Sequence, residues 1–319
     1  MVRGRGTAAR GIVLSDMKRV QLTSRKILLA PYAWLLLFVL VPLLIVLKIS
    51  LSQSELAQPP YTPVFDISAG WMGVIAYFSA LSFDNYALLW SDSLYRDSYA
   101  KSLVVAAMST TLLLLIGYPI AYAAARSPPG IRSIVLMLIV LPFWTAFLIR
   151  VYAWVTILQR DGLLNKALLA LGVISEPATW LATDTAVYIG IVYSYLPFMI
   201  LPLYAVLERI DDTLYEAASD LGATPWTSFW NITVPLSVPG IVAGVLLCYI
   251  PIVGEFVIPD LLGSSSTMMI GQTLWMEFFS NRDWPMASAV ATVMLVILLV
   301  PIAIYQHMRN RAFDQGRQA

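Results

Sequence analysis

Two carboxylates at the end of a long apolar stretch, Glu255 and Asp260, have the chemistry of a binding site. Glu255 directly follows the uncharged segment 236–254, and Asp260 comes five residues later. Ionisable groups at membrane depth are costly to bury and are therefore candidates for function. A carboxylate beside aromatic faces binds an ammonium group through ion pairing and cation–π attraction. The aromatic residues that could supply such faces lie in two other apolar segments: Tyr152, Trp154, Tyr193 and Tyr195.

These residues also have ordinary structural explanations. Glu255 could be a carboxylate at the end of a span that reaches interfacial water, or the ion-pair partner of Arg150. The aromatic residues could pack within a helix bundle or form an interfacial belt. The sequence leaves both alternatives open.

The chain lacks the residue sets of an enzyme's reactive centre. Its single cysteine, Cys248, lies within an apolar segment, and its single histidine, His307, lies near the end of the chain. One histidine without clustered thiols does not make a transition-metal site, and no nucleophile can be paired with a neighbouring base. No glycine-rich loop followed by lysine is present to hold a phosphate. We therefore expect neither catalytic residues nor a metal site.

A polar loop between two apolar stretches predicts a short helix that ends at a glycine. Residues 212–235 read DTLYEAASDLGATPWTSFWNITVP. Thr213 and Glu216 have the spacing of a capping box, which predicts a helix over 214–221. Gly222 then stands where a residue in the left-handed conformation would end that helix.

The same loop predicts a second short helix after the glycine. Thr224 followed by Pro225 is typical of an N-cap and a first helical residue, and Pro235 is expected to end this helix before the next span. Ala217 and Ala218 leave one face of the first helix small enough for another protein to approach closely. A plain connector between two spans is the alternative.

Long uncharged runs predict an all-α membrane protein. Hydrophobic residues make up 59% of the chain and charged residues only 12%, whereas soluble domains carry about a quarter charged residues. About 20 apolar residues in a helix cross the hydrocarbon core, and no alternating strand pattern indicates a barrel. Six spans are predicted, at residues 28–47, 103–125, 134–158, 185–207, 236–254 and 286–305.

The distribution of Lys and Arg predicts the orientation of these spans. The tail 1–27 carries seven basic residues and the tail 309–319 carries three. Because basic residues favour the cytoplasm, both tails are expected there, flanking a six-span transmembrane domain over 28–308. That topology makes 51–101 a periplasmic loop and 208–235 a cytoplasmic loop. The latter loop holds one arginine against five acids, a composition that suggests a protein partner.

The polar loop resembles the signature of permease subunits in binding-protein-dependent ABC importers. The pattern is Glu-Ala-Ala, then Gly six residues after the Glu, Ile ten later and Pro three beyond, with Val234 here where Leu is usual. The stretches PFWTAFLIRVYAW (142–154), GEFVIPDLLG (254–263) and NRDWPMASAV (281–290) resemble polyamine permeases, specifically the putrescine type. The signature residues are Glu216, Ala217, Ala218, Gly222, Ile232 and Pro235.

The resemblance implies a six-helix fold of the type I importer permease kind, with a cytoplasmic coupling helix. The signature residues would dock on a dimer of ATPase subunits that binds ATP and Mg²⁺, so no cofactor is expected in this chain. A second, similar permease subunit and a periplasmic substrate-binding protein would complete an assembly in the lipid of the bacterial inner membrane, and no nucleic acid is expected. The carboxylates and aromatic residues named first would then line the pathway of a polyamine.

Other functions predict different features. Putrescine is the expected substrate, and spermidine or another small organic solute is the alternative within the same class. An ion-coupled secondary transporter would have about ten spans, or inverted repeats with broken helices. A membrane enzyme would need a reactive residue set that the chain lacks, and a membrane scaffold that transports nothing is a further alternative.

Overall fold

The computed structural model describes residues 31–64, 75 and 77–315. The predicted N-terminal tail 1–27, ten consecutive residues of the predicted loop 51–101, and the last four residues of the predicted tail 309–319 lie outside the described residues. The chain forms two compact units, one from residues 1–85 with 284–292 and one from residues 86–283 with 293–319.

The first unit contains the first apolar helix. A π-helical turn, η1 (Leu36–Leu40), continues into α2 (Val41–Ser50), and both belong to the candidate membrane span Pro31–Ser50. A short antiparallel ribbon follows, with β1 (Gln53–Ser54) paired to β2 (Tyr61–Thr62). The side chain of Asn85 donates to the carbonyls of Ser50 and Ser52, at 2.9 and 2.8 Å, which fixes the chain beyond the end of α2.

Three long helices form the core of the second unit: α5 (Ser93–Arg126), α9 (Asp184–Leu207) and α12 (Val234–Val253). They approach closely because small residues lie where the helices cross. A Cβ added at Gly244 of α12 would lie 2.8 Å from the sulfur of Met199 in α9, closer than the two helices could accommodate. The side chains buried between them are predominantly apolar, as the packing of a helix bundle requires.

The third predicted span is broken rather than continuous. Helix α6 (Pro129–Val140) passes through a 3₁₀ turn, η3 (Leu141–Trp144), before α7 (Phe147–Leu158) leaves at a bend of 93°. Thr145 and Ala146 have extended backbones at the break. Pro142 contributes to it because a proline has no N–H to donate within the helix. The predicted span over 134–158 is therefore met only if the bent pair α6 and α7 counts as one span.

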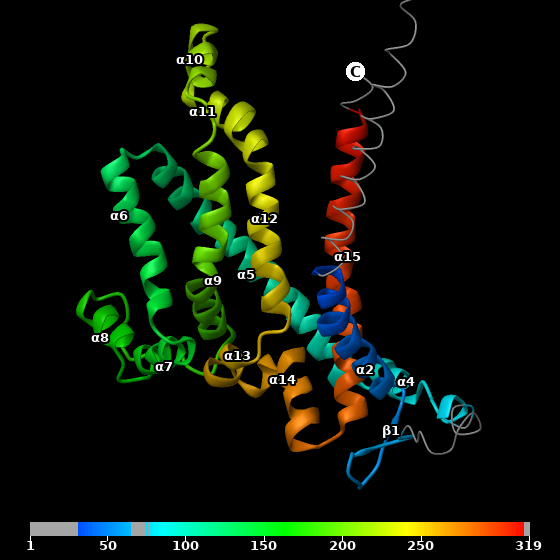
Figure 1. The fold of residues 1–319 in the computed structure, drawn as a ribbon. Helices are drawn as coiled ribbons and strands as arrows, with labels where there is room; N and C mark the ends of the chain where they lie inside the picture. Colours follow the sequence, from blue (N-terminus) through cyan, green and yellow to red (C-terminus); the bar gives the residue numbers. More distant parts are fainter. Residues whose placement is uncertain (1–30, 65–74, 76, 316–319) are drawn as a thin grey trace, which may run out of the picture. The chain divides into compact units, whose positions relative to one another are not determined.

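Shorter helices gather at the two ends of the second unit. Figure 1 shows α10 (Thr213–Asp220) and α11 (Pro225–Ser228) at one end, and α7, α13 (Val257–Leu262) and α14 (Ile270–Trp275) at the other. The remaining described elements are α4 (Asp84–Ser91), α8 (Leu163–Ala170), the 3₁₀ turn η5 (Ser265–Thr267), the π-helical turn η6 (Met276–Ser280) and α15 (Trp284–Gln315).

The helix that starts at Pro225 does not end at Pro235 as predicted. It passes through a π-helical turn, η4 (Phe229–Thr233), into α12, so that Pro225–Val253 is one continuous apolar helix. Pro235 is tolerated because it follows the π turn and lies at the start of α12. Among the described residues, five helices are long and apolar enough to cross a membrane, or six if α6 and α7 count as one broken span.

Candidate functional site

The angle between α10 and α11 is set at Gly222, whose φ of +82° lies in the left-handed region. The N–H of Gly222 donates to the Ser219 carbonyl at 2.8 Å, and the N–H of Ala223 donates to the Ala218 carbonyl at 2.9 Å. These two bonds form a Schellman motif, in which a left-handed residue closes the last turn of a helix. The predicted helix end at Gly222 is confirmed.

The start of α11 also follows the prediction. Pro225 is its first residue, and the Thr224 hydroxyl accepts the N–H of Thr227 at 3.3 Å. The sequence between the two short helices is therefore only Leu221 to Thr224, and hydrogen bonds hold both of its ends. The two helices consequently present a defined angle rather than a free linker.

The start of α10 differs from the prediction. Asp212 is the N-cap and Thr213 is the first helical residue, so the predicted capping box of Thr213 with Glu216 is wrong. The carboxylate of Asp211 takes its place, because Oδ1 accepts the N–H of Thr213 at 3.0 Å. This bond favours the ionised carboxyl and lowers the pKa of Asp211 below its usual value.

Two arginines fix the loop 208–235 to the neighbouring helices. Arg126, the last residue of α5, forms an ion pair with Asp212, and its guanidinium lies 4.2 Å from the centre of the Tyr215 ring. The hydroxyl of Tyr215 is 2.8 Å from the Thr233 hydroxyl, which joins α10 to the helix that leads into α12. These contacts join α10 directly to α5 and to the helix that leads into α12.

The second arginine acts on the end of α9. Arg132 of α6 forms an ion pair with Glu208 at 2.6 Å and donates to the Ala125 carbonyl at 3.2 Å. We name the four charged residues Arg126, Arg132, Glu208 and Asp212 the arginine clamp. It connects the start of the loop to α5 and α6, although the partners in each pair lie far apart in the sequence.

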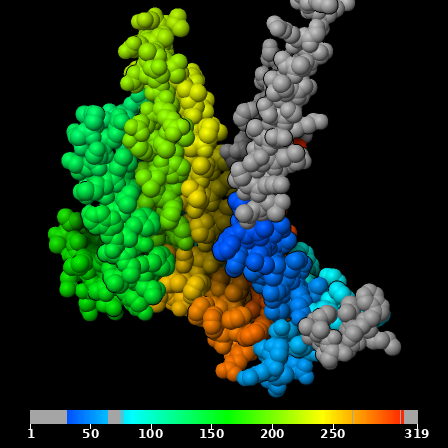
Figure 2. Space-filling model, viewed as in Figure 1, coloured from blue at the N-terminus to red at the C-terminus, as the bar shows by residue number. Residues whose placement is uncertain are grey.

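The surface of α10 and α11 consists in part of small and apolar side chains. Glu216 and Ala217 are exposed, and Leu221 and Trp226 are exposed to 90% and 71%. Figure 2 shows these two helices standing clear at one end of the second unit. Exposed apolar side chains on a rigid projection are typical of a surface that contacts another protein.

The predicted coupling residues do not all lie on this projection. Ala218 is half-buried on α10. Ile232 is half-buried and Pro235 is exposed, and both belong to the continuous helix that runs into α12. The structure thus places four of the signature residues at the projecting tip and two at its base.

At the other end of the second unit, Glu255 lies in the break between α12 and α13 with 7% of its surface exposed. Its Oε1 accepts the N–H groups of Val257 and Ile258 at 3.0 and 3.3 Å, and its Oε2 accepts the Tyr195 hydroxyl at 2.6 Å. Three donors therefore satisfy the carboxylate and hold the start of α13. This geometry gives Glu255 a structural role, but a different one from the predicted carboxylate in interfacial water, because the side chain is buried.

The ion pair considered between Arg150 and Glu255 is not formed. The guanidinium of Arg150 lies over the rings of Phe143 and Phe147, 4.9 and 5.8 Å from their centres. Arg150 has no ion-pair partner among the residues that the structure describes. Aromatic faces stabilise a buried guanidinium through cation–π attraction, so Arg150 holds the bend between η3 and α7.

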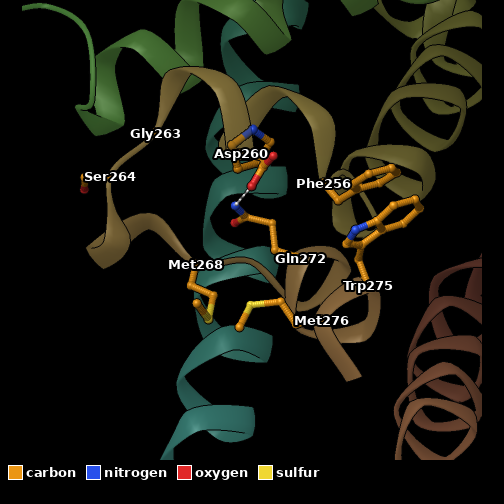
Figure 3. Close-up of a pocket in the computed structure, with 9 residues that line it drawn as sticks. Phe256, Asp260, Gly263, Ser264, Met268, Gln272, Trp275 and Met276 are labelled. Carbon is orange, nitrogen blue, oxygen red and sulfur yellow. Dashed lines mark hydrogen bonds between the residues drawn. The ribbon is translucent and has the colours of Figure 1, made fainter. Parts of the chain in front are cut away.

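Asp260 lies in a pocket between α13 and α14, which we name the α13–α14 pocket. Its volume is about 260 Å³. Figure 3 shows the side chains of Asp260 and Gln272 turned toward each other, with 3.5 Å between Oδ1 and Nε2, and the stacked rings of Phe256 and Trp275 beside them. The ring centres are 4.9 Å apart. The pocket therefore combines one exposed carboxylate with an apolar wall.

The predicted aromatic partners of Asp260 lie elsewhere. Trp154 and Tyr193 form an edge-to-face pair at 5.4 Å and line an apolar groove of about 580 Å³ along α5 and α9, without a carboxylate. Tyr152 is exposed on α7, and Tyr195 meets Glu255 through its hydroxyl rather than its ring face. The structure does not bring the six predicted pathway residues together into one site.

Sequence reasoning missed the aromatic pair Phe256 and Trp275 and the arginine clamp. A signal for the clamp existed, since Arg126 and Arg132 lie in the short segment between the predicted spans 103–125 and 134–158, which the predicted topology puts on the same side of the membrane as the acidic loop. No comparable signal links Phe256 to Trp275, because their contact depends on the fold of the segment 263–269 between α13 and α14.

The helices and their arrangement define a class of membrane protein, and solved structures share the fold. A chain of the bacterial alginate ABC transporter, in complex with alginate pentasaccharide-bound periplasmic protein, matches with a TM-score of 0.70 at 20% identity, over 93% of this chain and 97% of that one. A chain of the inward-facing MetNI methionine ABC transporter matches with a TM-score of 0.52 at 16% identity, over 66% of this chain and 92% of that one. At such identities the likeness shows the fold alone, which is the predicted type I importer permease fold.

The sequence assigns the chain to a family within that class. Residues 27–313 match the family described as binding-protein-dependent transport system inner membrane component, and the chain belongs to this family. It is 38% identical to the spermidine/putrescine transport system permease protein PotB of Haemophilus influenzae, over 86% of this chain and 90% of that protein. It is 36% identical to PotB of Escherichia coli, over 85% and 92%. The protein is thus a permease subunit of an inner-membrane ABC importer and not an enzyme.

Proposed function

We propose that this chain is the membrane-spanning permease subunit of an ATP-driven polyamine importer, with putrescine as its substrate. The observation that carries the proposal is the identity of 36–38% to permease proteins named for spermidine and putrescine, over 85–91% of this chain. The alternatives within the class are spermidine and other small organic solutes.

We further propose that the α10–α11 end faces the cytoplasm and the α13–α14 end faces the periplasm. Arg126 and Arg132 lie at the α10–α11 end, and basic residues near the ends of spans favour the cytoplasmic side. Both termini are proposed to be cytoplasmic, in agreement with the basic tails of the sequence.

In this proposal a cytoplasmic ATPase dimer docks on the exposed tip formed by Glu216, Ala217 and Gly222. Closure of the dimer moves α10 and α11 as one piece, because the Schellman motif holds their angle. The arginine clamp passes that movement to α5, α6 and α9, and the contact of Tyr215 with Thr233 passes it to α12. ATP and Mg²⁺ are bound by the ATPase, not by this chain.

The assembly has two further members in this proposal. One chain presents one docking element, whereas an ATPase dimer offers two clefts, so a second, similar permease subunit takes the other cleft. A periplasmic substrate-binding protein delivers the polyamine to the α13–α14 end, and lipid surrounds the apolar helices.

Uptake of labelled putrescine tests the proposal. The chain would be expressed with its neighbouring subunits in cells that lack their own polyamine importers. We expect ATP-dependent uptake that excess spermidine inhibits weakly. A variant with Glu216→Lys and Gly222→Pro is the uncoupled control and should show none.

Three outcomes would contradict parts of the proposal. An assembled wild-type complex that imports no polyamine would refute the substrate. Strong competition by spermidine would show that spermidine, rather than putrescine, is the preferred substrate. Uptake that persists after ATP depletion but stops when the membrane gradient is removed would refute coupling to an ATPase.

A further inference from the structure

We propose that the α13–α14 pocket binds one ammonium group of an aliphatic amine, with Asp260 as the counter-ion. The proposal rests on the proposed function only for the identity of the amine, and the pocket itself defines the chemical class. Its principal lining residues are Phe256, Asp260, Met268, Gln272, Trp275 and Met276.

The charge of the pocket selects a cation. Asp260 is exposed to the pocket and forms no ion pair with any residue in the described part of the chain. The one polar contact of its carboxylate there is the Gln272 amide at 3.5 Å, which is too long to satisfy an ionised oxygen. No lysine, arginine or histidine lines the pocket, so an incoming ammonium meets an unneutralised carboxylate.

The walls of the pocket select an aliphatic chain behind that ammonium. Figure 3 shows Met268 and Met276 below Gln272, and the stacked Phe256 and Trp275 to the right of it. Thioether and aromatic side chains provide adaptable apolar contacts for methylene groups. A volume of about 260 Å³ is below that of pockets for drug-sized ligands and suits a short chain.

The position of Asp260 in α13 offers a weaker explanation. It lies near the start of this helix, where a carboxylate interacts favourably with the helix dipole. Such an interaction does not require a pocket, apolar walls or an unpaired charge. Glu255 already holds the start of α13 with two hydrogen bonds, so Asp260 is not needed for that purpose.

The neighbouring pocket supplies a matched control. It shares Met268 with the α13–α14 pocket and contains an exposed carboxylate, Asp97, but Lys101 also lines it. Lys101 already forms an ion pair with Asp184 at 2.6 Å and does not neutralise Asp97, but its positive charge in the pocket wall repels an incoming cation. We therefore place no ammonium there. Asp97→Asn therefore removes the same charge from nearly the same surface without touching the proposed site.

The proposal is tested by measuring how labelled putrescine binds to the importer in nanodiscs. The importer here contains both permease subunits and the ATPase dimer but not the periplasmic binding protein. We expect Asp260→Asn to raise the Kd about tenfold or more, the effect of losing roughly 1.4 kcal/mol of ion pairing. Asp260→Glu should stay within about threefold of wild type, and Asp97→Asn should match wild type. ATP hydrolysis by each complex reports that it has assembled.

Several results would overturn the inference. They are a wild-type complex that binds no putrescine, an Asp260→Asn complex that binds as tightly as wild type, and an equal loss with Asp97→Asn. Uptake in cells tests the proposed function separately. If the wild-type importer takes up putrescine normally but its binding does not depend on Asp260, only the proposed site is rejected. If binding depends on Asp260 but no uptake occurs, the importer function is rejected and the ammonium site is retained.

Discussion

The two ends of the second unit treat their carboxylates in opposite ways. At the α10–α11 end, Asp212 and Glu208 are paired with arginines, and Asp211 accepts a backbone N–H. At the α13–α14 end, Asp260 stands in a pocket without an ion pair to any described residue. Paired charges hold elements in place, whereas an unpaired charge in a pocket is available to a ligand.

Burial does not distinguish the paired carboxylates from the unpaired one, because Glu208, Asp212 and Asp260 are all exposed. The clamp residues sit at the surface, where each ion pair contributes about 1 kcal/mol or less. They are therefore a way to fix geometry rather than a large source of stability. Glu255 is the informative exception at the α13–α14 end, because it is buried and fully satisfied and so belongs with the structural carboxylates.

The largest effect should come from breaking the rigid angle at the α10–α11 end. Gly222→Pro imposes a φ near −65° where the chain needs +82° and removes the N–H that donates to Ser219. We expect putrescine uptake to fall about tenfold or more, a loss equivalent to 1.4 kcal/mol of coupling energy or above.

A matched substitution at the same position separates backbone conformation from side-chain size. Asn tolerates the left-handed region, and a Cβ at Gly222 would meet no atom within 4 Å. Gly222→Asn should therefore keep uptake within about twofold of wild type. Equal uptake by the Pro and wild-type complexes would show that the angle between α10 and α11 does not matter.

Blocking the exposed tip should have the next largest effect. Ala217→Trp adds bulk to an exposed position of α10 without disturbing buried packing. We expect the ATPase to be lost when the permease is purified, while the permease itself stays folded. Ala217→Ser keeps the residue small and is the control. Normal recovery of the ATPase with the Trp variant would place the docking surface elsewhere.

Loosening the clamp should have a smaller, graded effect. Arg126→Gln removes an exposed ion pair and a cation–π contact, together worth about 1–2 kcal/mol. We expect the putrescine imported per ATP hydrolysed to fall about three- to tenfold. Arg209→Gln is the matched control, because Arg209 is exposed in the same loop. Identical ratios for the two variants would refute the clamp as a transmission element.

A double-mutant cycle sharpens that result. If Arg126 acts through Asp212, the Asp212→Asn variant should lose part of the same coupling, and the double variant should lose less than the sum of the single losses. Additive losses would mean that the two residues act independently, which their contact in the structure contradicts.

Local patterns predicted more of this molecule than long-range contacts did. The end of α10 at Gly222 and the start of α11 at Thr224 depend on residues within one or two turns, and the sequence identified both. The ion pair of Arg126 with Asp212 joins residues 86 positions apart, and the wall of Phe256 and Trp275 depends on how a loop folds.

The failures of local reasoning also have physical causes. Pro142 was visible in the third apolar run, but a proline alone does not determine whether a membrane helix kinks or breaks, so the 93° bend was missed. The predicted capping box failed because α10 begins at Thr213, one residue earlier than predicted, and the Asp211 carboxylate accepts the N–H of Thr213 itself. Pro235 suggested a helix end because a single sequence does not reveal the preceding π turn.

The smallest effect concerns Asp211 and sharpens the contrast with Asp260. Because folding lowers the pKa of Asp211, the bond to Thr213 stabilises α10 above the pKa of the unfolded chain, and this contribution is lost as the pH falls through the lowered folded pKa. We expect the amides of α10 to exchange hydrogen faster in Asp211→Asn than in wild type at neutral pH. The ratio of the two rates, in which the intrinsic pH dependence of exchange cancels, should approach one in acid.

Asp260→Asn should leave that ratio at one throughout, because its carboxylate holds no backbone N–H among the described residues. A ratio that does not change with pH would mean that the Asp211 carboxylate does not hold the start of α10.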